Sequence, residues 1–199
     1  MRRLFLVVSC LLLVVSCANA WRITPELQKE LKEKQALVKA NPKDADARFD
    51  LAITMAYTNN IQDGWVNLKK TVELDPGYRQ KGLEIYTKKV NEDINNWRLR
   101  FRLAFAYYFN DNKKEAIREL DNVLKLDPYN VWAYGYSALI NGELGNLDAA
   151  MDCTKKGLKI DSNVAALHLL LADGYNRKGD RWGAFAEAME AVRLRALGY

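Results

Sequence analysis

The sequence predicts an all-α fold in which pairs of antiparallel helices stack into a solenoid. The first observation is a period of 34 residues that small side chains share along the chain. The second is the tripeptide Leu-Asp-Pro at 74–76 and 126–128, followed 34 residues later by Ile-Asp-Ser at 160–162. The small residues in phase are Ala104, Ala138 and Ala172; Ala116, Ala150 and Ala184; and Gly145 and Gly179. A period shared by different residue types indicates a helical repeat array.

Composition limits the class of protein. The chain has 199 residues, of which 49% are hydrophobic and 28% charged, with 4 Pro and 11 Gly. This fits one domain or one short repeat array, and it excludes a collagenous or disordered chain. From residue 21 onward 28 Lys and Arg oppose 25 Asp and Glu, because two of the 30 basic residues are Arg2 and Arg3. The resulting charge of +3 predicts no dominant basic surface and no nucleic-acid partner.

Catalytic and metal-binding motifs are missing from the sequence. One His and three Cys cannot build a disulfide framework or a site with several His or Cys ligands. No phosphate-binding loop of the G-x-x-x-x-G-K-[ST] type occurs, and no pair of acidic residues stands out as an acid–base pair. We therefore expect no enzyme activity, no metal and no cofactor. His168 and Cys153 lie inside predicted helices, and we interpret both as packing residues.

The first twenty residues have the three parts of a secretory signal peptide. A short cationic start is followed by a twelve-residue apolar run, 4–15, which is too short to span a bilayer. Ala18-Asn19-Ala20 predicts cleavage before Trp21. Val14-Val15-Ser16-Cys17 also resembles a bacterial lipobox, in which Cys17 would carry the lipid, although Cys10 has the same context. Both alternatives predict export, to the periplasm, the exterior or an outer-membrane lipid anchor.

The helices follow in order after this segment. Residues 24–40 form a capping helix, since Thr24 and Pro25 suit its start and Asn41-Pro42 its end. Residues 79–96 interrupt the period as one extra helix, interpreted as a bend in the superhelix or as a degenerate half repeat that packs on its neighbours. The last helix, 181–197, leaves its outer face partly exposed or free to dimerise. The divisions are 1–20 signal peptide; 21–44 capping helix; and 45–199 the array, with repeats 45–78, 97–130, 131–164 and 165–198 and insertion 79–96.

The four repeats resemble the tetratricopeptide repeat (TPR) family. That family has an aromatic residue, Leu, a small residue and Tyr on a first helix, then small residues and Pro on and after a second helix. The matching residues are Leu103, Ala104, Tyr107, Ala116, Leu120 and Pro128 in the second repeat; Tyr134, Ala138, Gly145, Ala150 and Leu158 in the third; and Leu171, Ala172, Tyr175, Gly179, Ala184 and Ala191 in the fourth. The first repeat matches at Leu51, Ala52, Leu68 and Pro76, with Met55 and Gly64 in place of Tyr and Ala.

The resemblance implies a concave binding groove formed by the first helices. Its residues would be Phe49, Ile53, Tyr57, Arg98, Phe101, Arg102, Phe105, Tyr108, Phe109, Trp132, Tyr136 and Leu139, with Leu169, Asp173, Asn176 and Arg177 in the fourth repeat. A groove so rich in aromatic side chains suits a peptide or helix of a partner protein. The alternative is that the 24–40 helix, the 79–94 helix or a second copy of the chain covers this face.

Two arginines within this set allow two interpretations. Arg98 and Arg102 share one helix face, where they would bind an acidic ligand or pair with the nearby Glu92 or Asp93.

The predicted function is a non-catalytic protein–protein interaction scaffold in the bacterial cell envelope. The alternative is a structural homo-oligomer that associates through the aromatic face or the C-terminal end. A carbohydrate binder or an enzyme using the aromatic face is a third class.

Overall fold

The computed structural model describes residues 23–198, which form ten α-helices and no strand. The predicted all-α solenoid is confirmed. The signal segment and the candidate lipidation site at Cys17 lie outside the described residues. None of the described helices is long and apolar enough to cross a membrane.

Four helix pairs occupy the four predicted repeat ranges. They are α3 (Ala45–Ala56) with α4 (Ile61–Leu74), α6 (Trp97–Phe109) with α7 (Lys113–Leu126), α8 (Val131–Glu143) with α9 (Leu147–Ile160), and α10 (Ala165–Arg177) with α11 (Arg181–Ala196). Two unpaired helices complete the fold. α2 (Pro25–Ala40) packs on α3, and α5 (Tyr78–Glu92) packs on α6.

Local sequence explains where these helices begin and turn. The Thr24 hydroxyl accepts a hydrogen bond from the Leu27 N–H at 3.3 Å, and Pro25 opens α2. Gly145 and Gly179 end α8 and α10 in the left-handed conformation, with φ of 82° and 84°. In the first two pairs Asn59 and Asp111 adopt the same conformation, each with φ of 59°. Asn and Asp tolerate it better than other non-glycine residues, so the turn is kept without glycine.

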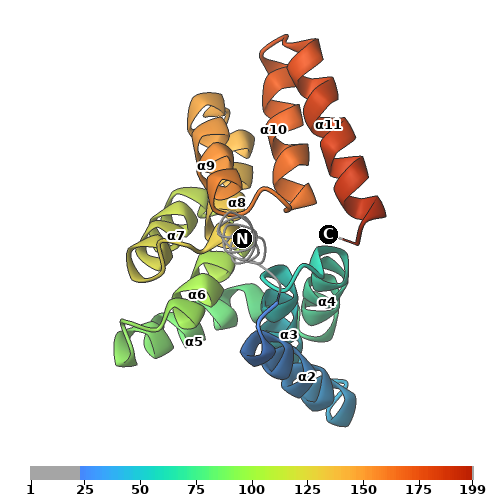
Figure 1. Cartoon of the computed structure of the whole chain (residues 1–199). Helices are drawn as coiled ribbons and strands as arrows, with labels where there is room; N and C mark the ends of the chain where they lie inside the picture. Colours follow the sequence, from blue (N-terminus) through green and yellow to red (C-terminus); the bar gives the residue numbers. More distant parts are fainter. Residues whose placement is uncertain (1–22, 199) are drawn as a thin grey trace, which may run out of the picture.

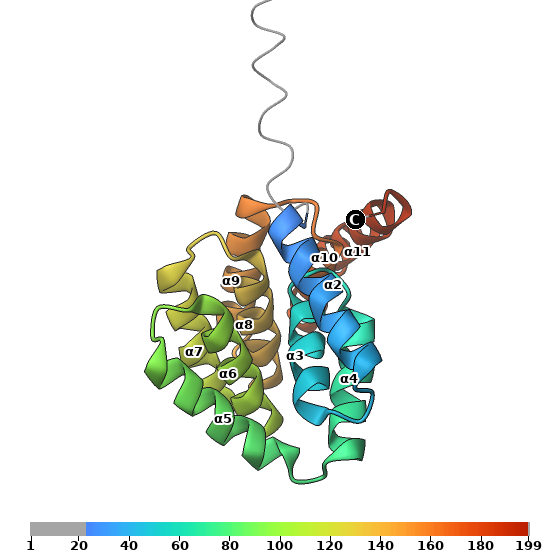
Figure 2. The ribbon, with the colours of Figure 1, turned by 90° about the horizontal axis from the view of Figure 1, so that it is seen from below.

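The inserted helix α5 changes how the pairs are arranged. α5 packs against α6 in the way that α7 packs against α8, and it hardly contacts α4. It therefore acts as the second helix of a half repeat, and the regular stacking is broken between α4 and α5. Figure 1 shows the helix pairs arranged around a common centre, and Figure 2 shows α2–α4 as one group beside the group that contains α5–α9.

This arrangement corrects the predicted open aromatic groove. Eight of its predicted residues are buried in the structure. They are Phe49, Ile53, Tyr57, Phe101, Arg102, Phe105, Trp132 and Tyr136, with exposures of 0–8%. The reason is that the face of α3 lies against α5 and α6, while α2 closes the same region. The chain itself thus covers the N-terminal part of its concave face, as the alternative interpretation expected of the helices at 24–40 and 79–94.

Candidate functional site

A buried cluster of charges holds α3 against α6. Arg102 of α6 is 3% exposed. Its Nε donates to Oδ1 of Asp50 at 2.9 Å, and its Nη2 donates to Oε1 of Glu30 at 3.1 Å. Tyr57 donates to the same Glu30 oxygen at 2.5 Å, and Tyr86 of α5 donates to Asp50. We call these five residues the clasp, because they join α2, α3, α5 and α6.

Two further cations border the clasp. Lys34 Nζ lies 2.7 Å from Oδ2 of Asp50, and Arg98 Nε lies 2.8 Å from Oε2 of Glu30. Arg98 and Arg102 are therefore neutralised within the chain, by carboxylates of α2 and α3. The expected pairing with Glu92 or Asp93 is wrong, because Glu30 and Asp50 take that place. The acids that bind Arg102 lie 52 and 72 positions away in the sequence, where helical spacing gives no information.

The clasp shifts the pKa values of its members. Burial would raise the pKa of Asp50, but the charge of Arg102 and the contacts with Lys34 and Tyr86 outweigh it and lower the pKa to about 2. Burial likewise opposes the change at Glu30, whose pKa is lowered by Tyr57, Arg102 and Arg98. Burial raises the pKa of Tyr57 to about 12, which keeps its hydroxyl protonated as a donor to Glu30.

Aromatic rings continue the contact between the two groups of helices. Phe101 meets the Tyr57 ring edge to face at 5.4 Å between centroids. Phe105 meets Tyr136 at 4.7 Å, and the Tyr136 hydroxyl donates to the carbonyl of Ala56 at 3.3 Å. Edge-to-face pairs of this kind stabilise beyond their buried area, by about 0.5–1.5 kcal/mol each. These residues are core, and α3 occupies the place that a bound segment would take.

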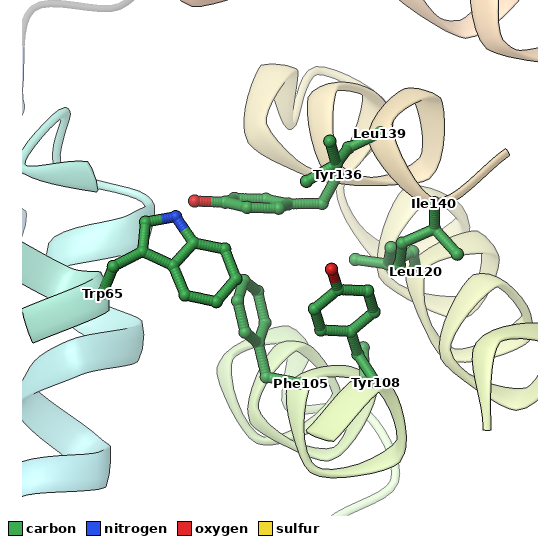
Figure 3. Close-up of a pocket in the computed structure, with 8 residues that line it drawn as sticks. Trp65, Phe105, Tyr108, Leu120, Tyr136, Leu139 and Ile140 are labelled. Atoms are coloured by element: carbon green, nitrogen blue, oxygen red, sulfur yellow. The ribbon is translucent and has the colours of Figure 1, made fainter. Parts of the chain in front are cut away.

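A small apolar pocket remains where this packing ends (Figure 3). Its cavity volume is about 10 Å³, which is room for about one water molecule. Trp65 of α4 forms one wall, facing Tyr108 of α6 at 6.4 Å between ring centroids. The lining residues are Trp65, Ala104, Phe105, Tyr108, Leu120, Tyr136, Leu139 and Ile140. Trp65 is 40% exposed, so this wall of the pocket is in contact with solvent.

A wider, more polar depression adjoins the pocket. Leu139 lines both, and the depression extends from it across α8, α9 and α10 with a volume of about 140 Å³. Its rim carries Glu143, Asp173 and Arg177. Arg177 Nη1 donates to the carbonyl of Gly142 at 2.9 Å, which fixes the guanidinium at the edge. Together, the pocket and the depression form what we call the open groove.

The open groove contains some of the predicted site residues. Tyr108 and Leu139 line it, as do Asp173 and Arg177 of the fourth repeat. Leu169 and Asn176 are exposed on α10. Phe109 does not line it, because its half-buried ring packs against Phe49 at 6.2 Å. Trp65 was missed because the family resemblance points only to first helices, and the bend after α4 brings a second helix to the concave face.

A hydrogen bond between Tyr108 and Glu143 lies at the rim of the pocket. The Tyr108 hydroxyl donates to Oε1 of Glu143 at 2.7 Å, and Lys113 Nζ lies 3.3 Å from Oε2 of the same carboxylate. Burial and the Glu143 charge raise the pKa of Tyr108 well above its usual value, so the hydroxyl stays neutral. The mouth of the pocket therefore offers polar atoms at its rim beside an apolar surface.

Other reactive side chains are engaged in packing. The ring nitrogens of His168 lie 2.6 Å from Oε2 of Glu187 and 2.9 Å from the carbonyl of Ser162. Burial raises the pKa of the Cys153 thiol, and Asp152 adds to this, which lowers its reactivity. Within residues 23–198 no three His, Cys, Asp or Glu side chains gather as metal ligands.

Comparisons with known proteins agree with this architecture. Residues 98–130 match the tetratricopeptide repeat family model. A structure of MamA, MSR-1, has a TM-score of 0.56 at 17% identity, covering 87% of this chain and 90% of that one. Another MamA crystal structure has a TM-score of 0.52 at 20% identity, covering 86% and 90%.

A third solved structure has the same fold. YrrB, described as a TPR protein with an unusual peptide-binding site, has a TM-score of 0.55 at 16% identity and covers 82% of this chain and 92% of its own. One repeat matches by sequence and the stacked pairs match by fold. Residues 98–130 are thus similar to the tetratricopeptide repeat, and the described part of the chain has the fold of these solved structures.

Proposed function

We propose that the chain binds a segment of a partner protein in the open groove. An apolar side chain of that segment packs on the exposed face of Trp65 at the mouth of the pocket, and the segment continues over Leu139 toward Arg177. The observation that carries this proposal is the half-exposed Trp65, which faces solvent at an apolar pocket that shares Leu139 with a depression rimmed by charged residues. Large aromatic anchors beside a polar rim are typical of binding hot spots.

The open groove replaces the longer aromatic groove as the proposed binding site. The N-terminal part of the concave face is filled by α3, so a partner is expected to bind at the C-terminal part only. The proposal also includes export to the cell envelope, which the signal-like segment at 1–20 supports. The intact mass of the mature protein distinguishes cleavage before Trp21 from lipidation at Cys17.

Site-specific photo-cross-linking tests the binding site. We would place p-benzoylphenylalanine at Trp65 or Leu169, and at the control position Tyr129, which is 71% exposed in the loop between α7 and α8. Irradiation in intact cells is expected to yield the same cross-linked partner from positions 65 and 169, and none from 129. In the position-169 protein, Trp65→Ala is expected to lower the yield about tenfold or more, since aromatic anchors dominate binding energy.

The outcome that contradicts the proposal is equally clear. Identical products from positions 65, 169 and 129 would show that capture reflects general surface exposure. Capture at position 169 that is unchanged by Trp65→Ala would exclude the pocket as the anchor. Far-UV circular dichroism must first show that Trp65→Ala keeps its helical content.

A further inference from the structure

The last helix has apolar side chains on two opposite faces. Ala191 and Leu194 are buried against α10, at 1% and 0% exposure. On the outer face, Trp182, Phe185, Met189 and Val192 are 83%, 58%, 50% and 59% exposed. Their spacing of three and four residues places them in one row along the helix. We call this row the α11 stripe.

Helices that are apolar on two sides are normally covered on both. Within residues 23–198 the second helices α7 and α9 are covered in this way, α7 by α8 and α9 by α10. No described helix packs on the outer face of α11. The rings of Trp182 and Phe185 meet at right angles, 6.5 Å between centroids, so they form one patch. A contiguous exposed patch of this kind marks an interaction surface.

The opposite end of the array indicates what covers the stripe. The exposed side chains along α2 are mainly polar and charged, among them Gln28, Lys29, Lys32, Glu33 and Gln35, with Leu37 the one large apolar exception. If copies stacked head to tail, the apolar α11 stripe of one copy would contact the charged face of α2 of the next. Apolar and charged surfaces are not complementary, so this arrangement is unfavourable. The apolar surface that matches the stripe is the stripe of another copy.

We propose that two copies of the chain pair through the α11 stripe around a two-fold axis. An antiparallel arrangement centred near Met189 places Phe185 of each copy close to Val192 of the other. It also sets the two helix dipoles in opposition, which is favourable. A closed pair of this kind uses the same patch on both copies, as most symmetric dimers do.

The size of the stripe is sufficient for a specific contact. Its four side chains expose roughly 500 Å² of apolar surface, given about 150–250 Å² for each large aromatic side chain. Pairing then buries about 1,000 Å² in total, which is the lower limit for a specific interface. No residue that lines the open groove belongs to α11, so the dimer presents two open grooves. Two grooves on one dimer bind a partner with two copies of the recognised segment more tightly than one groove does.

The test measures mass as a function of concentration, using the mature full-length chain. Analytical ultracentrifugation is expected to show a monomer–dimer equilibrium for the wild type. Phe185→Glu/Met189→Glu is expected to weaken the dimer at least about 100-fold, because it places four like charges in the contact. The matched control Val66→Glu/Tyr129→Glu alters residues that are 66% and 71% exposed elsewhere, and it is expected to leave the dimer unchanged. All these positions are exposed, so the variants should keep their fold.

A cysteine at the two-fold axis provides an independent measurement. In a Cys153→Ser background, Met189→Cys is expected to form an intermolecular disulfide on mild oxidation, and Val66→Cys is not. A monomer at all concentrations would overturn the proposal, as would species larger than two or a monomer that floats with phosphatidylglycerol vesicles. Neither measurement needs the partner protein. Failure of the dimer proposal can therefore be distinguished from failure of the binding proposal that the cross-linking at Trp65 tests.

Discussion

At the scale of single residues, Arg102 has the largest role. Its guanidinium is almost fully buried, and it donates to Asp50, to Glu30, to the Thr54 hydroxyl at 3.2 Å and to the carbonyl of Arg98 at 3.1 Å. Burying ions is costly, and the cost is offset only when each charge has partners of good geometry. The clasp meets this condition, so its charges fix one docking geometry between α3 and α6.

Removing Arg102 is expected to destabilise the fold strongly. Arg102→Ala leaves two carboxylates inside the molecule without their main cation, which costs about 3–5 kcal/mol of unfolding free energy. Arg98→Ala is the matched control, since its side chain is 38% exposed and its loss should cost less than about 1 kcal/mol. Urea unfolding followed by circular dichroism measures both values. Equal losses of unfolding free energy in the two variants would contradict the stabilising role of Arg102 in the clasp.

The lowered pKa of Asp50 predicts that the fold becomes less stable as the pH falls. The pKa of Asp50 is about 2 in the folded chain, against an ordinary value of 3.8. The lowered pKa means that its stabilisation is complete above the ordinary value and is lost as pH falls toward 2. The difference in unfolding free energy between wild type and Asp50→Asn should therefore narrow by about 2 kcal/mol between about pH 5 and pH 2. Urea titrations of both proteins at several pH values measure this difference. A difference that stays constant with pH would contradict the lowered pKa of Asp50.

The sequence predicts which residues of a helix are apolar, but not what covers them. The TPR resemblance places Phe101 and Phe105 on the face that would point into the groove. They are buried because α3 lies on that face, and the contact depends on a bend that no local pattern encodes. The same reason explains Arg102, whose face was predicted and whose partners were not. Tyr108 and Leu139 line the open groove instead.

At the scale of helices, α5 determines the architecture. Its buried face carries Tyr78, Tyr86 and Val90. The rings of Tyr78 and Tyr86 lie 5.4 and 5.2 Å from the ring of Phe49, measured between centroids. α5 thereby anchors α3 from one side while α6 anchors it from the other. The extra 18 residues are thus the cause of the closed N-terminal half.

Truncating Tyr86 tests this role of α5. Tyr86→Ala removes a fully buried ring from Phe49 and a hydrogen-bond donor from Asp50, and it should cost about 3–5 kcal/mol. Tyr86→Phe keeps the ring and should cost about 1 kcal/mol, near the net value of one hydrogen bond. Thermal unfolding followed by circular dichroism compares the two. A loss of equal size in both variants would show that the hydroxyl, not the packing, holds α5.

Helix boundaries were the most predictable part of the fold. They depend on neighbouring residues, as at Thr24 and Pro25 or at the two turn glycines, so a single sequence contains the information. The placement of α5 on α6 and away from α4 was not predictable, because it depends on which exposed faces are complementary. Trp65 shows the consequence, since a residue on a second helix became a wall of the pocket.

At the scale of the whole molecule, the chain consists of two groups of helices. The first comprises α2–α4 and the second α5–α11. They are joined by a loop at 75–77 and by the contacts of α3 with α5 and α6. The first group fills half of the concave face of the second and leaves the other half as the open groove. Folding of the two groups should therefore be cooperative.

Cutting the loop tests how firmly the two groups adhere. A protease site inserted after Pro76, in a stretch exposed at the surface, allows cleavage of the folded protein. The cleaved chain is expected to elute as one particle in size-exclusion chromatography, because the buried rings and the clasp remain. In Arg102→Ala the same cut should release two fragments. Separation of the cleaved wild type at physiological salt would mean that only the covalent link holds the groups together.

The clasp also sets the order in which the chain can fold during synthesis. Arg102 is 52 residues later than Asp50 in the sequence, so α3 emerges from the ribosome well before the helix that covers it. At about 5–20 residues per second the wait is about 3–10 s. During that interval Asp50 can pair with Lys34 and Glu30 with Tyr57, but their partner on α6 has not yet been synthesised. The aromatic face of α3 therefore stays uncovered for several seconds of synthesis, because its contacts with α5 and α6 can form only after both helices have been made.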